Sequence, residues 1–336
     1  ERRPQSGTFL LALPAAPVRG DDCGIALIAP FQATSEPGSG EDAEWLYRVV
    51  SAFERVAVPA GARLLLKDQS PFLHDPCSIK DLAREAAAQG ARAAILLHPA
   101  GPWEKITCAL ALLHDAGVHP VIVSGRDYPG LASRVYFDSG WGAYLATRHL
   151  LQQGHQRIAF LGVWGEQEWV TERLRGYRDA LEAAEIEPDD AWVPHSETTR
   201  DPEVRAHAAL ERLLELPKAR RPTAIVASND ALALALLRSA ALLGVAVPAA
   251  LSLVGFDNSP AALLAGLTTI ERPTEALGEA IAHTTLARIA AGMEAGTVTQ
   301  RLRPVLIERT TVACGSTIAH GANRELVCLS PNAKEQ

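Results

Sequence analysis

Charged and amide side chains stand directly after several apolar runs of this sequence. Three pairs of such residues are Arg126 and Asp127 after VIVSG, Asn229 and Asp230 after AIVAS, and Asp257 and Asn258 after LSLVGF. Arg173 lies beyond the loop that follows a fourth run, IAFLGV. An arginine fork and a carboxylate can each bind two adjacent hydroxyl groups, and an aromatic ring can cover the C–H face of a sugar. These residue types therefore suit the recognition of a polyhydroxylated ligand.

The same residues also have purely structural interpretations. Asn229, or Ser228 before it, could cap a helix that starts at residue 230. Asp257 could cap a helix that begins at Ser259-Pro260, and Arg173 could form an ion pair on the surface. Spacing along the chain does not decide between these interpretations and ligand binding.

Motifs of catalysis and cofactor binding do not occur in the sequence. No GxGxxG follows a strand, PGSG at 37–40 lacks the Lys-Ser/Thr of a phosphate loop, and there is no GxSxG elbow. The five cysteines form no CxxC pair, which argues against a zinc site or a disulfide framework and fits a reducing cytoplasm. We read HDPC at 74–77 as a polar turn, not a metal cluster. We therefore expect a cytoplasmic binding protein without catalytic, metal or cofactor sites.

Short apolar runs alternate with helical periods along the whole chain. The runs are continuously apolar, which indicates parallel sheets covered on both faces by helices. Two such series in tandem predict an α/β protein of two doubly wound parallel-sheet lobes. Ligands of such sheets bind at the carboxyl ends of the strands, where the polar residues above stand. The expected strands are 23–30, 62–68, 93–99, 119–125, 157–163, 222–228 and 251–256, and helices are expected near 41–56, 142–154, 171–185, 202–216, 230–243 and 274–292.

The overall charge and hydropathy exclude two classes of partner. The net charge of −7 argues against nucleic-acid binding by the bulk field of the chain. No apolar stretch approaches the ~18–20 residues that a membrane span needs. Any contact with DNA would have to come from a local basic element.

Four ordered segments resemble one known family. They are VYFDSGWGAYLATRHLLQQGHQRIAFLG (135–162), ERLRGYRDAL (172–181), PTAIVASNDALALALLRSAALLGVAVPAALSLVGFDNSP (222–260) and LTTIERPTEALGEAI (267–281). From about residue 23 to 317 the chain resembles the effector-binding domain of LacI/GalR-family repressors, which share the type I periplasmic-binding-protein fold. The resemblance implies two lobes joined by three hinge crossovers, which close around a small effector and change how a separate domain binds operator DNA.

The resemblance also implies an effector site. The family's ligand contacts fall on Asp138, Arg173, Asn229 and Asp257, with Arg272 as a fifth. Family aromatics at the pocket suggest Phe256 and Trp141, and Arg126 stands where the first lobe contributes. The loop FQATSEPGSGEDAEWLY (31–47) is longer and more acidic than its family counterpart, so the resemblance does not fix the identity of the effector. A sugar is the first expectation by family analogy.

Lobe boundaries and assembly follow by the same analogy. The first lobe is expected to comprise about 21–154 and 271–297, and the second about 155–270 and 298–317, with a C-terminal tail at 318–336. The crossovers are expected after the helix at 142–154, near 268–273 and near 296–300. A homodimer is expected through faces near 41–57 and 101–116. The alternative function is a solute-binding protein of a sugar transporter.

The opening stretch ERRPQSGTFLLAL resembles the last β-hairpin of a GntR-type winged helix. Gly7 suits the tip of such a hairpin, and Arg2 and Arg3 would lie beside the phosphate backbone of DNA. Residues 1–20 are therefore expected to be the end of a winged-helix DNA-binding domain and its linker, as in arabinose-repressor-like regulators. The competing interpretation is a plain N-terminal arm.

Overall fold

A computed structural model of the chain describes residues 23–29, 31, 40–69, 78–97, 99, 102–162, 168–194 and 201–315. The chain forms two compact units. Unit 1 comprises Glu1–Phe137 and Pro273–Leu302, and unit 2 comprises Asp138–Arg272 and Arg303–Gln336. The expected N-terminal hairpin with Arg2 and Arg3, and the tail at 318–336, lie outside the described residues.

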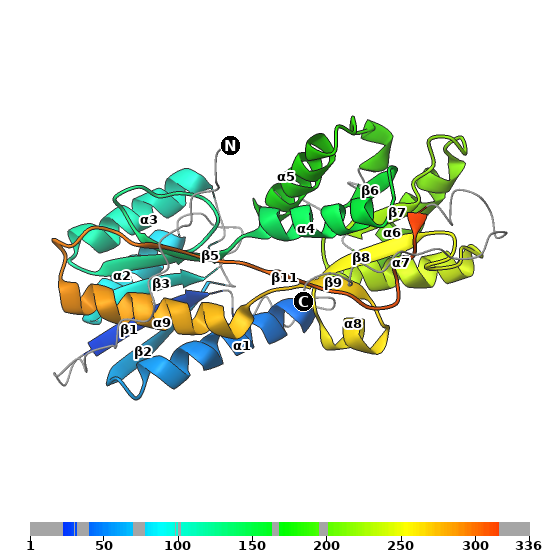
Figure 1. The fold of residues 1–336 in the computed structure, drawn as a ribbon. Helices are drawn as coiled ribbons and strands as arrows, with labels where there is room; N and C mark the ends of the chain where they lie inside the picture. The colour runs from blue at the N-terminus through cyan, green and yellow to red at the C-terminus, as the bar shows by residue number, and fades with distance from the viewer. Residues whose placement is uncertain are drawn as a thin grey trace, which may run out of the picture. The chain divides into compact units, whose positions relative to one another are not determined.

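A six-stranded parallel sheet forms the centre of unit 1, in the order β10-β5-β4-β3-β1-β2. Two helices, α1 and α9, lie side by side on one face, and α2 and α3 cover the other (Figure 1). Both faces are therefore apolar, and every residue of β1 is buried. The strands are β1 (Cys23–Ala29), β2 (Ala62–Asp68), β3 (Ala91–Leu97), β4 (His119–Val123), β5 (Ser133–Phe137) and β10 (Thr299–Leu302), and the helices are α1 (Gly40–Ala57), α2 (Ser78–Ala88), α3 (Trp103–Asp115) and α9 (Thr274–Ala291).

Unit 2 is built around a five-stranded sheet in the order β11-β9-β8-β7-β6. Strands β6 to β9 are parallel, and β11 is antiparallel to β9. Helices α6 and α7 pack together over one apolar core, while α4 packs against α5 and against β7, β8 and β9. The strands are β6 (Ile158–Leu161), β7 (Ala224–Ala227), β8 (Ser252–Asp257), β9 (Thr268–Glu271) and β11 (Val305–Ile307); the helices are α4 (Ser139–Gln152), α5 (Glu168–Ala183), α6 (Pro202–Glu215), α7 (Asp230–Leu242) and α8 (Pro260–Leu264), with a 3-10 turn η3 (Asp190–Trp192).

The predicted fold class of two doubly wound, mainly parallel sheets is confirmed. One expected boundary is wrong: the chain first passes between units at Phe137/Asp138, before α4, not after it. The reason is that α4 buries its inner face on α5 and on the sheet of unit 2. The later passages lie at Arg272/Pro273 and Leu302/Arg303.

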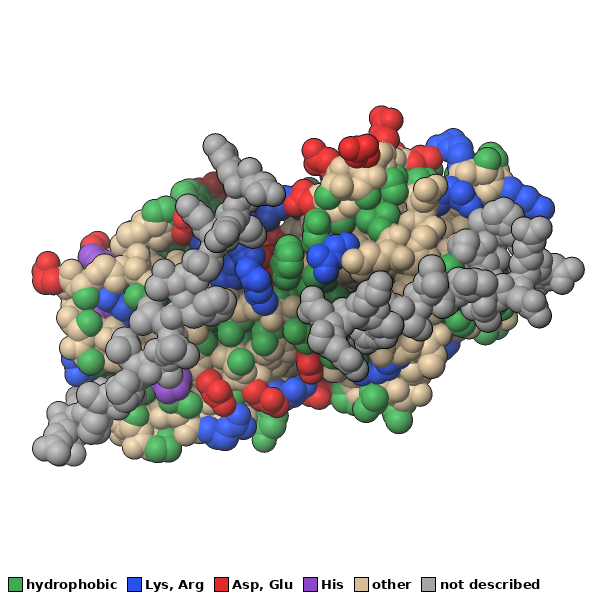
Figure 2. All heavy atoms as spheres, viewed as in Figure 1, with side chains coloured by type: hydrophobic (Ala, Val, Ile, Leu, Met, Phe, Trp, Pro, Cys, Tyr) green, Lys and Arg blue, Asp and Glu red, His purple; other side chains and the backbone are tan. Residues whose placement is uncertain are grey.

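The outer face of α5 carries acidic side chains, which gather over this helix in the space-filling view (Figure 2). Asp179, Glu182 and Glu185, in the helix and the turn after it, are exposed. Arg175 and Arg178 of the same helix are exposed as well, so the surface of α5 carries charges of both signs.

Helices α4 and α5 approach each other so closely that glycine is required between them. A Cβ added at Gly176 would lie 1.9 Å from the carbonyl oxygen of Gly140. The backbone of α4 thus sits directly on α5, which fixes the position of α5 relative to the sheet.

We predict that Gly176→Ala lowers the free energy of unfolding by about 1–3 kcal/mol, because the new methyl group forces the two helices apart. Urea unfolding followed by circular dichroism measures this change. The matched control is Gly296→Ala, where an added Cβ meets no atom within 4 Å. Equal stability of the two variants would contradict the close-packing argument.

Candidate functional site

The carboxyl ends of β7, β8 and β9 bring the predicted polar residues of unit 2 to one edge of its sheet. These strands are neighbours and parallel, so the residues that follow them emerge at the same edge. Asp257 lies opposite Glu271 in the register of β8 and β9, next to Arg272. We call Arg173, Asp257 and Arg272 the arginine–carboxylate cluster.

Arg173 is the buried centre of this cluster. It is only 2% exposed, and its guanidinium lies 3.5 Å from the ring centroid of Phe256 and 4.4 Å from that of Trp169. One Nη1–H group donates a hydrogen bond to the carbonyl oxygen of Ser228. The proposal that Arg173 is a surface ion-pair residue is therefore wrong, and its planar head group is held in one orientation.

Two arginine side chains lie beside the carboxylate of Asp257. Its Oδ1 lies 3.0 Å from Nε of Arg272 and 3.7 Å from Nη2 of Arg173. The backbone at Asp257 has φ 124°, and Asn258 has φ 57°, both in regions that side-chain-bearing residues seldom adopt. Such strain is maintained only where the surroundings over-determine it, and it is common at binding sites.

The capping interpretation of Asp257 is also wrong. The N-cap of α8 is Ser259, whose side chain accepts from the backbone N–H of Ala262. The carboxylate of Asp257 is thus directed to the two arginines and not to the helix that follows.

Asn229 and Asp138 both act as helix caps. Oδ1 of Asn229 accepts from the N–H of Leu232 at 3.0 Å, and Oδ1 of Asp138 accepts from the N–H of Trp141 at 2.8 Å. The capping interpretation of Asn229 is therefore confirmed. A cap uses one oxygen of each side chain, so the Asn229 amide N–H groups and the second Asp138 oxygen are directed elsewhere.

The two predicted aromatic residues have different environments. Phe256 is fully buried, and a Cβ on Gly142 of α4 would come within 2.7 Å of its ring. Its ring packs against the guanidinium of Arg173. Trp141 stacks on Tyr144 with ring centroids 5.2 Å apart, and the guanidinium of Arg303 lies 5.6 Å from the Trp141 ring.

Arg126 belongs to unit 1 and follows β4, as predicted. Its side chain is exposed, and its backbone N–H donates to Oγ of Ser124 at 3.0 Å. The residue stands at the carboxyl edge of the sheet of unit 1, the edge at which ligands of such sheets bind.

A second layer lies behind the cluster, and of its residues only Asn258 was among the polar residues predicted after the strands. Asn258 donates to Glu271 at 3.1 Å and accepts from Arg309 at 2.5 Å, while Arg309 also donates to the carbonyl oxygen of Leu267 at 2.7 Å. These bonds fix the turn after β8 and so the direction of Asp257. Arg309 lies after the third passage of the chain between the units, in a segment where the sequence showed no motif.

Asp230 is a buried carboxyl group beside the cluster, and it is one of the polar residues that the sequence placed directly after a strand. Its two oxygens accept from Oγ1 of Thr269 at 2.6 Å and from the N–H of Ser259 at 2.7 Å. Burial, and then the negative charge of Asp257, raise the pKa of Asp230 to about 7, against the hydrogen bonds that lower it. In the sequence Asp230 looks like an ordinary acidic residue of a first helical turn.

Glu172 is a second carboxyl group with a raised pKa. Burial first, and then the negative charges of Glu168 and Asp138, raise the pKa of Glu172 to about 7, and the positive charges of Arg175 and Arg173 oppose this. A carboxyl group near its pKa at neutral pH can either donate or accept a hydrogen bond.

The part of the chain that the structure describes has neither a metal-binding cluster nor a membrane-spanning helix. There, no three His, Cys, Asp or Glu side chains come together in a way that could hold a metal ion. Within the same residues, no helix is long and apolar enough to cross a membrane.

The sequence that carries the cluster is similar to known proteins. A model of the periplasmic binding protein-like domain matches residues 147–312. The repressor PurR of Escherichia coli O139:H28 is 31% identical over 210 residues, which make up 61% of this chain and 60% of PurR. The chain is therefore similar to LacI-type regulators over a periplasmic binding protein-like domain, and we call this part the LacI-type domain.

Solved structures share the fold of this LacI-type domain. The transcriptional regulator CelR in complex with cellobiose is 26% identical with a TM-score of 0.69, covering 88% of this chain and 86% of CelR. A LacI family regulator from Enterococcus faecium with bound ribose is 24% identical with a TM-score of 0.67, covering 87% of this chain and 99% of its own. The predicted family resemblance is confirmed.

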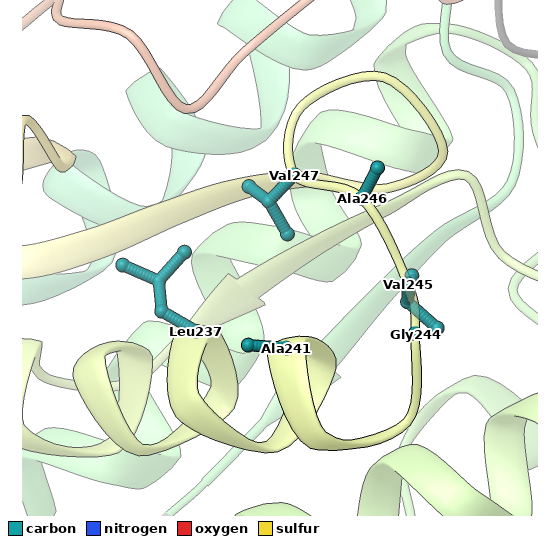
Figure 3. Close-up of a pocket in the computed structure, with 6 residues that line it drawn as sticks. All are labelled: Leu237, Ala241, Gly244, Val245, Ala246 and Val247. Carbon is teal, nitrogen blue, oxygen red and sulfur yellow. The ribbon is translucent and has the colours of Figure 1, made fainter.

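A shallow apolar depression elsewhere on the LacI-type domain does not compete with the cluster as an effector site. It lies at the end of α7 and along the segment that leads to β8, and Leu237, Ala241, Val245 and Val247 are among its lining residues (Figure 3). None of its lining side chains is polar. No side chain there can bind the hydroxyl groups of a polar effector.

We predict that the stability of the LacI-type domain depends on the protonation of Asp230. The pKa of Asp230 in the folded state lies above that in the unfolded chain, so the neutral form favours folding. This contribution is complete below about pH 4 and is lost as the pH rises to about 7, at about 1 kcal/mol per pH unit.

Asp230→Asn removes the titrating group, so the free energy of unfolding should fall less between pH 4.5 and 7.5 than in the natural protein. Urea unfolding at several pH values measures the slope. Asp179→Asn, on the exposed face of α5, is the control for losing one formal negative charge. Parallel curves for Asp230→Asn and the natural protein would refute the prediction.

Proposed function

We propose that this LacI-type domain is the sensor of a transcriptional regulator and that it binds a small polyhydroxylated effector, a sugar, at the arginine–carboxylate cluster. The observation that carries the proposal is the buried, oriented guanidinium of Arg173 beside the carboxylate of Asp257. The pair offers donors in a fixed plane and acceptors next to them. Vicinal hydroxyl groups, which both donate and accept, match that arrangement.

The organisation of the cluster supports tight and selective recognition. Arg173 is held by the Ser228 carbonyl group and by two aromatic rings, so little conformational entropy is lost when a ligand binds. A ligand that lacks a hydroxyl group where Asp257 needs a donor would leave a largely buried carboxylate without compensation. Specificity should therefore depend on the stereochemistry of neighbouring hydroxyl groups.

The known neighbours support the ligand class but not a single sugar. One was solved with ribose and another with cellobiose. A pentose and a disaccharide differ in size, so the cluster would be a shared part of recognition and the rest of the pocket would select the sugar. In our proposal Asp138, Asn229, Trp141 and Arg126 contribute to that selection.

The regulatory step follows from linkage. An effector changes the conformational equilibrium of the domain only by its differential affinity for the two states. We propose that this change alters operator binding by a separate DNA-binding domain, in a cytoplasmic homodimer. The naming of the PurR relative as a repressor favours this function over that of an enzyme or a transporter's solute-binding protein.

We predict that one sugar among pentoses, hexoses, sugar acids and sugar phosphates raises the melting temperature of the protein saturably. Arg173→Lys and Asp257→Asn should each remove this shift, because lysine lacks the planar fork and asparagine lacks the second acceptor oxygen. Differential scanning fluorimetry, with each variant compared with its own unliganded melting temperature, measures the effect.

Arg178→Ala is the matched control for these two variants, since Arg178 is an exposed arginine of the same helix, α5. It should keep the full shift. If both cluster variants respond to the sugar as Arg178→Ala does, the cluster is not the effector site. If no sugar in the screen binds to the natural protein, the proposed ligand class is wrong.

We also predict that this sugar changes DNA binding by the full-length natural protein at least severalfold. Electrophoretic mobility shifts on the DNA upstream of its own gene, with and without the sugar, measure the change. The Asp257→Asn protein should bind the same DNA with no response to the sugar. Sugar binding without any DNA binding would support the solute-binding alternative instead.

A further inference from the structure

A second, polar cavity lies within unit 1, at the amino-terminal edge of its sheet. It has a volume of about 220 Å³, and its lining includes His114 of α3, His119 at the start of β4, Ser133 at the start of β5 and Arg288 of α9. The turn after α9, residues 293–297, completes the wall. Nothing in the proposed effector site uses these residues.

His119 and Ser133 are directed to the same face of the sheet. Side chains alternate along a strand, and Val121 and Val123 of β4 belong to the core under α1 and α9. His119 therefore points to that side, and the same argument places Ser133 there, because Val135 of β5 is in the same core. Both side chains thus face the helix that carries Arg288.

His119 is a buried polar group without a hydrogen bond. The residue is 5% exposed, and in the described part of the chain no residue is hydrogen-bonded to its imidazole ring. No atom of His119 is among the fully buried polar atoms without a partner in the described residues, so its ring is open to the cavity, where a bound group can reach it. Ser133 is 1% exposed, and its Oγ accepts from the N–H of Val298 at 3.1 Å, so its hydroxyl hydrogen can donate to another group.

The electrostatic environment of this cavity is positive. Burial, and then the positive charges of Arg288, Arg92 and His114, lower the pKa of His119. Arg288 is itself buried, and it donates to the carbonyl oxygens of Ala295 at 2.6 Å and Gly296 at 2.7 Å, which fixes both the charge and the wall of the cavity. Glu294 also lines the cavity, but it is exposed, so solvent and salt screen its charge.

We propose that this cavity binds a small oxyanion, a carboxylate or a group of the sulfate and phosphate type, with His119 and Ser133 as hydrogen-bond donors and Arg288 as the neighbouring positive charge. An anion would supply the missing partner of His119 and offset the cations around it. The site is separate in the sequence and in its residues from the arginine–carboxylate cluster, so it can be present whether or not the domain binds a sugar.

Anion binding should be linked to the protonation of His119. The charged groups that face this residue are Arg288 from α9, Arg92 from β3 and His114 from α3, with Glu294 in the turn. An oxyanion stabilises the imidazolium form, so the pKa of His119 rises when the anion binds and affinity increases as the pH falls. A tenfold preference for the imidazolium form raises that pKa by about 1 unit.

Sulfate is a suitable probe, because it does not titrate near neutral pH. We predict that sodium sulfate, titrated at constant ionic strength against sodium chloride, shifts the ring resonances of His119 saturably in NMR spectra of histidine-labelled protein, and raises its pKa. Acetate and phosphate, titrated in the same way, show which anion type the cavity prefers. Resonances of His207, on α6 of unit 2, are the internal control and should not respond.

Two variants test the donors by the backbone amide resonances of residues 292–298. Ser133→Ala should weaken sulfate binding about tenfold, the typical effect of losing one hydrogen bond to a charged group. His119→Gln keeps an N–H donor but cannot be charged, so the binding that remains should no longer strengthen at low pH. The proposal is overturned if His119 titrates identically in sulfate, acetate, phosphate and chloride, or if both variants bind sulfate as the natural protein does.

Discussion

The burial of one positive charge, that of Arg173, is the constraint on which much of unit 2 depends. A guanidinium removed from water must have its charge and its N–H groups compensated nearby. The compensation comes from the Ser228 carbonyl oxygen after β7, from Asp257 at the end of β8, and from the ring of Phe256. That ring in turn fits only because Gly142 of α4 has no side chain. The buried guanidinium of Arg173 in α5 thus determines which groups stand at the ends of β7 and β8, and why α4 has glycine at position 142.

Carboxyl groups near this cation divide into two kinds by their surroundings. Asp257 lies between two arginines, whereas burial and neighbouring negative charges raise the pKa values of Asp230 and Glu172 to about 7. The first kind is a fixed acceptor. The second kind can carry a proton at neutral pH, so the sheet edge can hold several acidic side chains without accumulating their full negative charge.

Much of the fold could be predicted because the buried strands are continuously apolar and are followed by polar residues and capped helices. The strands β5, β9, β10 and β11 were not predicted, because SRVYF, TTIE, TQRL and VLI are only three to five residues long. The first passage between units was misplaced because the sequence of α4 does not show which sheet its inner face covers. Arg173, Asp257 and Arg272 were assigned through family motifs, and Asp230 was a candidate by its position after a strand. Arg309 acts through tertiary contacts that no local pattern indicates.

The passages of the backbone between the two units coincide with residues of the candidate site. Unit 2 begins at Asp138, its first segment ends at Arg272, and its second segment begins at Arg303, which lies over the Trp141 ring. A small molecule held by these side chains would act directly on the linkers, without a relay of packed residues between binding and response. Substitutions that retune the strength of the response should therefore concentrate at these three positions, and a change of ligand preference there would alter signalling at the same time.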